Sequence, residues 1–206
     1  MTNKNLIIPK TKNMTLPSKF DNETFELSRE HLNLFIERCS KKIALPNKDL
    51  LEIGPQKRSE VQNFFSICNI KTLDIVSDYN PHIIGDITKF NSHIADESYD
   101  IITCLEILEH TVNPFSAIEE LRRILKNNAY LMLSAPLNWR IHGPAPDCWR
   151  ITEFGWKVLL KDFDIIEIDK LNTPGRNLFP IKYNILAKCN KDKNIDLDTM
   201  KFDLVD

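Results

Sequence analysis

The segment from Asp49 to Gln56 constrains the fold more than any other part of the chain. A short apolar run, interrupted by Glu52, ends at the dipeptide Gly54-Pro55. This order is typical of a buried strand that leaves a sheet through a tight turn. A carboxylate near the end of a buried strand is costly unless a partner compensates for it. Because ligands of doubly wound α/β sheets bind beyond the carboxyl ends of the strands, Glu52 is a candidate ligand-binding residue.

The pattern around this segment alternates between helices and strands. Helices are expected over 26–45, 58–67, 114–126 and 153–160, and strands over 49–53, 70–75, 82–87, 99–105, 129–134, 163–171 and 181–189. Such alternation predicts a mostly parallel sheet with helices on both faces. The last two strands have no long helix between them, so we expect them to pair antiparallel at the sheet edge.

Length and composition predict one domain. The 206 residues, 42% of them hydrophobic, suffice for one core over residues 26–190, with an N-terminal arm or lid over 1–25 and a polar tail over 191–206. The net charge of -2 gives no attraction to nucleic acid or to an anionic membrane. Five scattered cysteines without a CxxC pair favour a reducing cytoplasm over a zinc cluster or a disulfide framework.

Acidic side chains follow several of the expected strands. Glu52, Asp74 and Asp86 stand at successive strand ends, and Glu106 follows the fourth strand. We expect them to converge on one crevice that faces hydroxyl and amine donors. The glycine patterns that bind phosphate, GxGxxG and GxxxxGK[ST], are both absent. A ligand with ribose and adenine but without pyrophosphate fits this combination.

Five short motifs occur along this region in a recognisable order. They are Glu52-Ile53-Gly54-Pro55, Leu73-Asp74, Gly85-Asp86-Ile87, Tyr99-Asp100 and Leu105-Glu106-Ile107-Leu108-Glu109-His110. Together they resemble the class I S-adenosylmethionine-dependent methyltransferases, and within these the small "type 11" enzymes, over about residues 48–163 and the final strand pair. The resemblance implies a Rossmann-like, doubly wound, seven-stranded sheet, mostly parallel with the last strand antiparallel, and S-adenosyl-L-methionine as cofactor.

The resemblance also implies roles for individual residues. Glu52 and Gly54 would lie at the methionine end of the cofactor, and Asp74 would hold the ribose hydroxyls. Asp86 would meet the adenine amine with Ile87 beside the ring, and Cys104 and Glu106 would flank the sulfonium and the substrate. The full set of expected cofactor-binding residues is Glu52, Gly54, Pro55, Gln56, Asp74, Ile75, Asp86, Ile87, Cys104, Leu105, Glu106 and His110. Gln56 departs from the family, which usually has a second glycine there, and its side chain narrows the approach of the backbone to the cofactor.

The long loop over 137–152 is the expected acceptor site. His142 titrates near neutrality and is the candidate base, and Asp147 could orient it. Arg140 and Arg150 could bind a phosphate or carboxylate of the substrate. The alternatives are a loop histidine bonded to backbone and an Asp147–Arg150 pair that only pins the loop.

Two further expectations concern this loop. A metal site from His142, Asp147 and Glu109 has no supporting ligand spacing, so no metal is predicted. The His…Asp-x-Trp-Arg-x-Thr pattern of the loop resembles methyltransferases found with surface-polysaccharide genes. That resemblance implies a nucleotide-linked sugar or capsule precursor as acceptor.

The leading hypothesis is a cytoplasmic methyltransferase that acts on an oxygen of a small, anionic molecule. A homodimer is the oligomeric state that we consider. The first alternative is a non-catalytic, methyltransferase-like binding module, which Gln56 suggests. The second is a nicotinamide-dependent oxidoreductase, against which the missing GxGxxG argues. A nucleic-acid substrate is not expected, because the chain lacks a basic stripe and a base-flipping motif.

Overall fold

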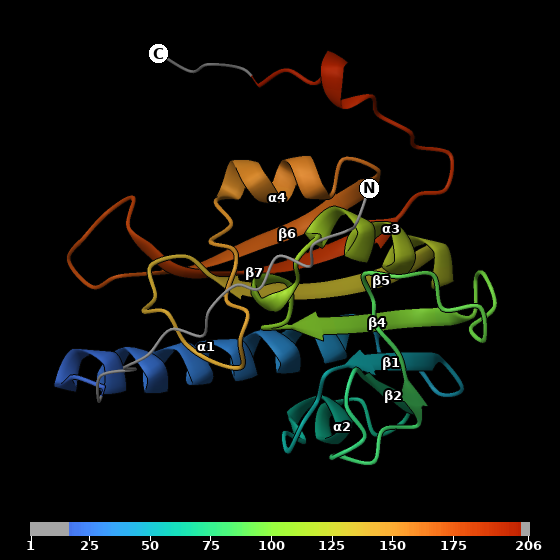
Figure 1. Cartoon of the computed structure of the whole chain (residues 1–206), viewed down its shortest axis with the longest axis horizontal. Helices are drawn as coiled ribbons and strands as arrows, with labels where there is room; N and C mark the ends of the chain where they lie inside the picture. The colour runs from blue at the N-terminus through green and yellow to red at the C-terminus, as the bar shows by residue number, and fades with distance from the viewer. Residues whose placement is uncertain (1–16, 203–206) are drawn as a thin grey trace, which may run out of the picture.

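A seven-stranded sheet runs through the middle of the molecule (Figure 1). The computed structural model describes residues 17–202, and its strands lie in the order β3-β2-β1-β4-β5-β7-β6. The strands are β1 (Asp49–Ile53), β2 (Asn69–Asp74), β3 (Ile83–Ile84), β4 (Tyr99–Leu105), β5 (Leu125–Pro136), β6 (Phe163–Asn172) and β7 (Pro180–Cys189). β7 runs antiparallel to both of its neighbours, whereas the other adjacent pairs are parallel. The predicted fold class is therefore confirmed.

Helices cover both faces of the sheet. α1 (Lys19–Ile43) and α2 (Glu60–Phe64) contribute to one hydrophobic cluster, and α3 (Pro114–Ile124) and α4 (Glu153–Leu159) contribute to the other. Two short 3₁₀ helices, η1 (Leu108–His110) and η2 (Leu197–Thr199), complete the elements. Within residues 17–202, no helix combines the length and the apolar character needed to cross a membrane.

The central strands are buried from both sides. Leu50 of β1 and Ile101 of β4 face the α1 cluster, whereas Leu51 and Ile102 face the cluster of α3 and α4. Strands in this position read as continuous apolar runs, because neither face meets water. The same alternation directs Glu52 toward the α1 face of the sheet.

The N-terminal boundary differs from the sequence prediction. α1 begins at Lys19, seven residues before the expected start at Glu26, so the prediction of an arm over 1–25 is wrong for residues 19–25. A capping box explains the earlier start: the Asp21 N–H donates to Ser18 Oγ (3.1 Å), and the Ser18 N–H donates to the Asp21 carboxylate (2.8 Å). Residues 1–16, the rest of the predicted arm, lie outside the described residues.

Three other elements differ strongly in length from their predictions. α2 and β3 are shorter than expected, with five and two residues. β5 is longer, because it starts directly where α3 ends, and Lys126 therefore belongs to a strand rather than to a helix. The Lys126 ammonium contacts Asp100 (2.7 Å), which anchors the start of β5 beside β4.

Phe35 offers a test of how α1 is held on the sheet. Its side chain is fully buried, whereas its neighbour Leu34 is 53% exposed. We expect Phe35→Ala to lower the free energy of unfolding by about 3–5 kcal/mol, because it leaves a cavity under the helix. Leu34→Ala, the matched control, should change it by less than about 0.5 kcal/mol. Urea denaturation followed by circular dichroism measures both, and equal losses in the two variants would contradict the packing described.

Candidate functional site

The strand-end acids gather at one edge of the sheet. β1, β2 and β3 are parallel neighbours, with Ile53 beside Leu73 and Asp74 beside Ile84. The chain leaves β1 with the Gly54 N–H donating to Leu73 O (2.7 Å). Glu52 and Asp74 are both buried near these ends. The register therefore brings the predicted acids to the ends of neighbouring strands.

The turn after β1 requires glycine at one position and tolerates a side chain at another. Gly54 has a φ of +59°, and an added Cβ would lie 2.5 Å from Ile107 Cδ1. Pro55 follows it in a buried position. Gln56 also has a positive φ, 51°, which explains the usual preference for glycine there. Its side chain is exposed and is not among those that line the cavity beside Glu52.

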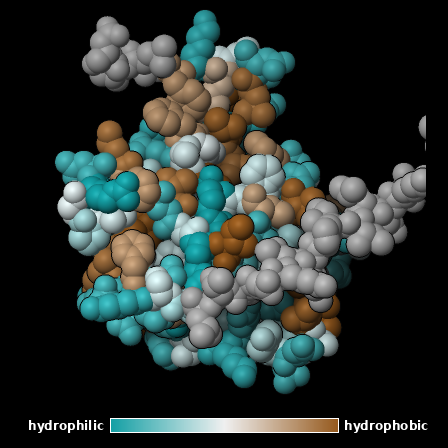
Figure 2. All heavy atoms as spheres, turned by 60° about the vertical axis from the view of Figure 1, so that its left-hand side comes forward, coloured by the Kyte–Doolittle hydropathy of each residue, from teal (hydrophilic) through white to brown (hydrophobic). Residues whose placement is uncertain are grey.

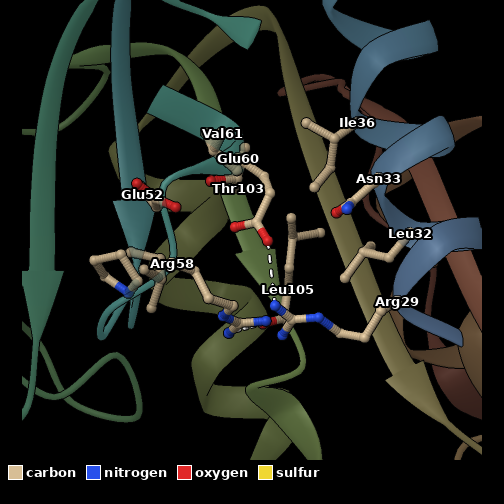
Figure 3. Close-up of a pocket in the computed structure, with 12 residues that line it drawn as sticks. Arg29, Leu32, Asn33, Ile36, Glu52, Arg58, Glu60, Val61, Thr103 and Leu105 are labelled. Atoms are coloured by element: carbon tan, nitrogen blue, oxygen red, sulfur yellow. Dashed lines mark hydrogen bonds and ion pairs between the residues drawn. The ribbon is translucent and has the colours of Figure 1, made fainter. Parts of the chain in front are cut away.

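A small cavity of about 20 Å³ lies between α1 and the ends of β1 and β4 (Figure 3). This volume is enough for about one water molecule. Burial raises the pKa of Glu52 to about 7, even though Gln62 donates a hydrogen bond to its carboxylate (3.1 Å). Among the described residues, the Thr103 hydroxyl has no hydrogen-bond partner. A polar ligand group at this position would satisfy both side chains.

Two arginines that the sequence analysis missed meet at this cavity. Arg29 of α1 contacts Glu60 (3.2 Å), and Arg58 donates to the Leu105 carbonyl (3.3 Å). Both arginines line the cavity, and Figure 3 shows their guanidinium groups toward the same end of it. Two cations held together favour an anion, such as a carboxylate. Arg29 carries no signal of its own, because it stands in an ordinary amphipathic helix pattern.

The acids after β2 and β3 have different local roles. Asp74 accepts a hydrogen bond from the Val76 N–H (3.2 Å), and Ile75 beside it is 65% exposed. Asp86 accepts from the Thr88 N–H (2.9 Å) and hydroxyl (2.7 Å), as in an Asx-type turn. Burial alone would raise the pKa of Asp86, but these bonds and Lys89 (3.2 Å) lower it. Ile87 is buried in the cluster of α3 and α4, and its place beside an adenine ring stays a prediction.

One residue at the end of β4 needs a correction. Cys104 was expected to flank the sulfonium, but its thiol is fully buried in the α3/α4 cluster, and this burial raises its pKa. Strand alternation causes this placement, since Leu105 next to it faces the α1 cluster instead. Neither of these β4 side chains projects to an open surface in this structure.

Glu106 is held by a buried cation. Its carboxylate contacts Lys182 Nζ (2.9 Å) and accepts from the Ser134 hydroxyl (2.8 Å). Lys182 lies in β7 and is only 1% exposed. Burial alone would raise the pKa of Glu106, but Lys182 and Ser134 hold it below its ordinary value. Lys182 could not be found from the sequence, because its burial depends on the pairing of β7 with β5.

The loop over 137–152 is fastened to η1. The N–H groups of Cys148 and Trp149 donate to the Glu109 carbonyl (2.7 and 3.2 Å), and the Trp149 indole donates to Thr111 O (2.8 Å). His110 Nδ1 lies 2.8 Å from the Pro146 carbonyl. These contacts bring His142 beside His110, with ring centroids 4.9 Å apart.

His142 and Asp147 come together as predicted. Asp147 Oδ2 lies 3.2 Å from His142 Nδ1 and accepts from the His142 N–H (2.9 Å), while Arg150 binds both Asp147 oxygens (2.6 and 2.7 Å). Burial would raise the pKa of Asp147, but Arg150 and the His142 backbone lower it to about 2. Burial lowers the pKa of His142 despite Asp147, which favours an uncharged ring at neutral pH. Arg150 thus pins the loop, and its role as an anion binder stays a prediction.

One cluster in this region has the residue types of a metal site. The side-chain ligand atoms of Glu109, His110 and His142 all lie within 4.8 Å of one another. The metal site considered from the sequence had Asp147 in place of His110, because nothing in the spacing shows that the loop folds back over η1.

Comparison with known proteins identifies the family. The profile described as "Methyltransferase domain" matches residues 25–167. The chain belongs to this methyltransferase family. The motifs that carried the resemblance all lie within the matched range, and the nicotinamide-dependent alternative gains no support.

Curated relatives of this methyltransferase are named ubiquinone biosynthesis O-methyltransferase. The one from Histophilus somni is 27% identical over 132 residues, which are 57% of this chain and 53% of that enzyme. The one from Glaesserella parasuis is 38% identical over 56 residues, 27% of this chain and 24% of that enzyme. The chain thus spans about half, or less, of the length of these relatives.

Solved structures share the fold. A methyltransferase from Methanosarcina mazei, described as SAM-dependent, superposes with a TM-score of 0.55 at 17% identity, covering 73% of this chain and 96% of its own. The N-methyltransferase NodS from Bradyrhizobium japonicum gives a TM-score of 0.56 at 16% identity, covering 83% and 99%. The family uses S-adenosylmethionine, which is therefore the cofactor of this chain.

Glu52 makes a pH-dependent stability test possible. Its pKa is about 7 in the folded protein and about 4.5, its ordinary value, in the unfolded chain. Between these values the folded state binds more protons, so the contribution of Glu52 to the free energy of unfolding falls as pH rises through this window and stays lost above it. Glu52→Gln should therefore gain stability relative to the parent, by about 2–3 kcal/mol, between about pH 5 and about pH 8.

Urea denaturation of both proteins at the two pH values, without cofactor, measures this difference. A pH-independent difference would show that Glu52 is not the buried acid described.

Proposed function

We propose that the chain transfers a methyl group from S-adenosylmethionine to a hydroxyl oxygen of a small acceptor. The observation that carries this proposal is the position of the His142 ring, which lies 3.2 Å from Asp147 on the loop that folds over η1. A hydroxyl acceptor needs a group that takes its proton, and an imidazole near neutrality suits this role. The names of the curated relatives support oxygen as the acceptor atom.

The residues at the sheet edge fit the cofactor. Asp74 presents a carboxylate that two ribose hydroxyls can share, and Glu52 can pair with the methionine ammonium. Arg29 and Arg58 would bind the methionine carboxylate, which offsets the charge of the two guanidiniums. When bound, the cofactor supplies an electrophilic methyl on sulfur, and its transfer forms an oxygen–carbon bond as the sulfur–carbon bond breaks. The hydroxyl proton passes to His142.

A hollow of about 330 Å³ between the start of α1 and the loop offers room for the acceptor. It is lined by Phe20, Asp21, Thr24, Leu137, Asn138, Trp139, Arg140 and Phe179. Aromatic walls suit a planar ring. Figure 2 turns the left-hand side of Figure 1 forward and shows apolar and polar side chains interspersed over that face. We therefore favour a planar, hydroxylated acceptor, and a phenol is the first class to test.

A nucleotide-linked sugar or capsule precursor is the second acceptor class. The loop pattern in the sequence suggested it, but the curated relatives are named for ubiquinone biosynthesis instead. Arg140, which lines the hollow and contacts Asp21 (3.3 Å), is the group that would favour an anionic acceptor of this kind. A panel of phenols and nucleotide-linked sugars, assayed with radiolabelled cofactor, separates the two classes.

Asp74 and His142 should affect different steps. We expect Asp74→Ala to weaken cofactor binding at least about tenfold, because it removes a charge-assisted hydrogen-bond acceptor. His142→Ala should bind the cofactor as tightly as the parent but turn over about 10²–10⁴-fold more slowly. Isothermal titration with S-adenosylhomocysteine and initial rates on the best acceptor of the panel measure the two effects. A fully active His142→Ala variant would remove the proposed base.

Arg29 gives a test of the methionine end. Decarboxylated S-adenosylmethionine lacks the group that Arg29 would bind, so the parent should bind it at least about tenfold more weakly than S-adenosylmethionine. Arg29→Met should bind the two compounds with nearly equal affinity. Lys41→Met, on the same helix and exposed, is the control. An unchanged preference in Arg29→Met would exclude this role.

A further inference from the structure

Asp86, the residue expected at the adenine amine, follows a weakly supported part of the sheet. The strand before it, β3, has two residues and forms one edge of the sheet. Strand pairing therefore holds this segment from one side, through β2. A side chain that binds a ligand must be held close to its productive position by the groups around it. The contacts beyond β3 therefore decide where the Asp86 carboxylate lies.

The side-chain amide of Asn91 makes such contacts. It is buried inside the turn that Asp86 begins, and its NH2 group donates to the main-chain carbonyls of Asp86 (3.1 Å) and Lys89 (2.9 Å). Its Oδ1 lies so close to Gly85 that a Cβ added there would be 2.5 Å away. Asn91 thus contacts the main chain on either side of the Asp86 Cα.

Glu120 of α3 holds Asn91 in place. Its carboxylate accepts from the Asn91 N–H (2.9 Å) and from the Asn91 side-chain amide (3.0 Å). Arg123 binds both oxygens of this carboxylate (2.8 Å each), and the Glu120 side chain is only 4% exposed. Burial alone would raise the pKa of Glu120, but Arg123 and Asn91 hold it below its ordinary value. Hydrogen bonds to such a carboxylate are strong, so α3 gives the Asp86 turn a rigid support.

Apolar packing alone does not give the same support. Ile87 and Ile94 of this segment are buried in the cluster of α3 and α4, which keeps the segment on the core. Apolar contacts are non-directional, whereas hydrogen bonds fix the orientation of the groups that they join. The orientation of the Asp86 turn therefore depends on Asn91 and Glu120.

We propose that Asn91 and Glu120 are positioning residues for the adenine end of the cofactor. Glu120 orients the Asn91 amide, and Asn91 fixes the turn from which the Asp86 carboxylate accepts a hydrogen bond from the adenine amine. This role rests on the cofactor of the proposed function and on the predicted role of Asp86. Neither positioning residue belongs to the motifs that carried the family resemblance.

Discrimination between two ligands tests this role in the full chain. S-inosylhomocysteine has an oxygen in place of the adenine amine of S-adenosylhomocysteine, so it cannot donate to Asp86 from that position. We expect the parent to prefer S-adenosylhomocysteine at least about tenfold, because a hydrogen bond to a carboxylate is lost with the other compound. Asn91→Ala, and Glu120→Gln, which keeps the side-chain volume, should each reduce this preference to about twofold or less. Isothermal titration measures the affinities.

Three control variants separate this effect from others. Asp74→Ala should weaken the binding of both compounds and leave their ratio unchanged, because both carry the same ribose. Phe35→Ala loses stability under α1 and should also leave the ratio unchanged, so a loss of stability alone does not mimic the effect. Asn194→Ala removes an exposed asparagine of the tail and should bind like the parent.

Gly85 gives a second way to disturb the same contact. In Gly85→Ala the added Cβ displaces the Asn91 amide, so the preference should fall as it does in Asn91→Ala. The double variant should lose no more than either single variant, because both changes remove one contact. Circular dichroism confirms that each variant is folded. Should Asn91→Ala and Glu120→Gln fail to fold, Gly85→Ala decides.

Three results would overturn the proposal. They are equal binding of the two compounds by the parent, a parental preference in folded Asn91→Ala or Glu120→Gln, and additive losses in the double variant.

Turnover separates this inference from the proposed function. Asn91→Ala should raise the KM for S-adenosylmethionine and leave kcat within about twofold of the parent, since it disturbs binding rather than the reacting groups. Methyl transfer by the parent, together with an unchanged preference in Asn91→Ala, leaves the function standing and removes the positioning role. A preference that the variants lose, without methyl transfer by the parent to any member of the panel, supports the positioning role and removes the function.

Discussion

Burial of the central strands from both sides is the constraint on which the structure depends. β1 and β4 pack against helices on each face, so most side chains along their length are apolar. Polar groups that bind or react are therefore restricted to the strand ends and to the loops that follow them. Glu52, Asp74 and Glu106 all stand at this boundary, where the backbone has left the sheet or is about to leave it.

Several acids lie at one edge of the sheet, where burial and mutual repulsion disfavour their charged forms. The contacts that offset these effects differ from residue to residue. Glu106 keeps its charge, because Lys182 and Ser134 hold it. Glu109, three residues later, has no such partner within the described part of the chain, and its pKa is raised. Asp147 is kept ionised by Arg150. The edge thus combines carboxyl groups of lowered and of raised pKa within one small region, which simple counting of acidic residues does not show.

Much of the fold follows from local sequence patterns, whereas the site depends on contacts between distant segments. The apolar runs of β1 and β4 and the antiparallel pair β6 and β7 were predicted, because period and turn residues are local signals. The burial of Lys182 and the core position of Cys104 were not, since each depends on which face a strand presents after pairing. The early start of α1 was encoded locally, by Ser18 and Asp21, but the solvent-exposed first turns hid it from a search for apolar periodicity. The contact between His142 and Asp147 was correctly predicted. The position of His110 beside them could not be predicted, because it depends on how the loop folds back over η1.

The attachment of the loop to η1 has a consequence for how this scaffold can diversify. Two of the hydrogen bonds that hold the loop join main-chain atoms, because the N–H groups of Cys148 and Trp149 donate to the Glu109 carbonyl. These two bonds do not depend on which side chains the residues carry. Substitutions between Leu137 and Pro146 can alter the walls of the hollow while these two hydrogen bonds remain. The sequence of this region can therefore change without loss of the bonds that fix its position on the domain.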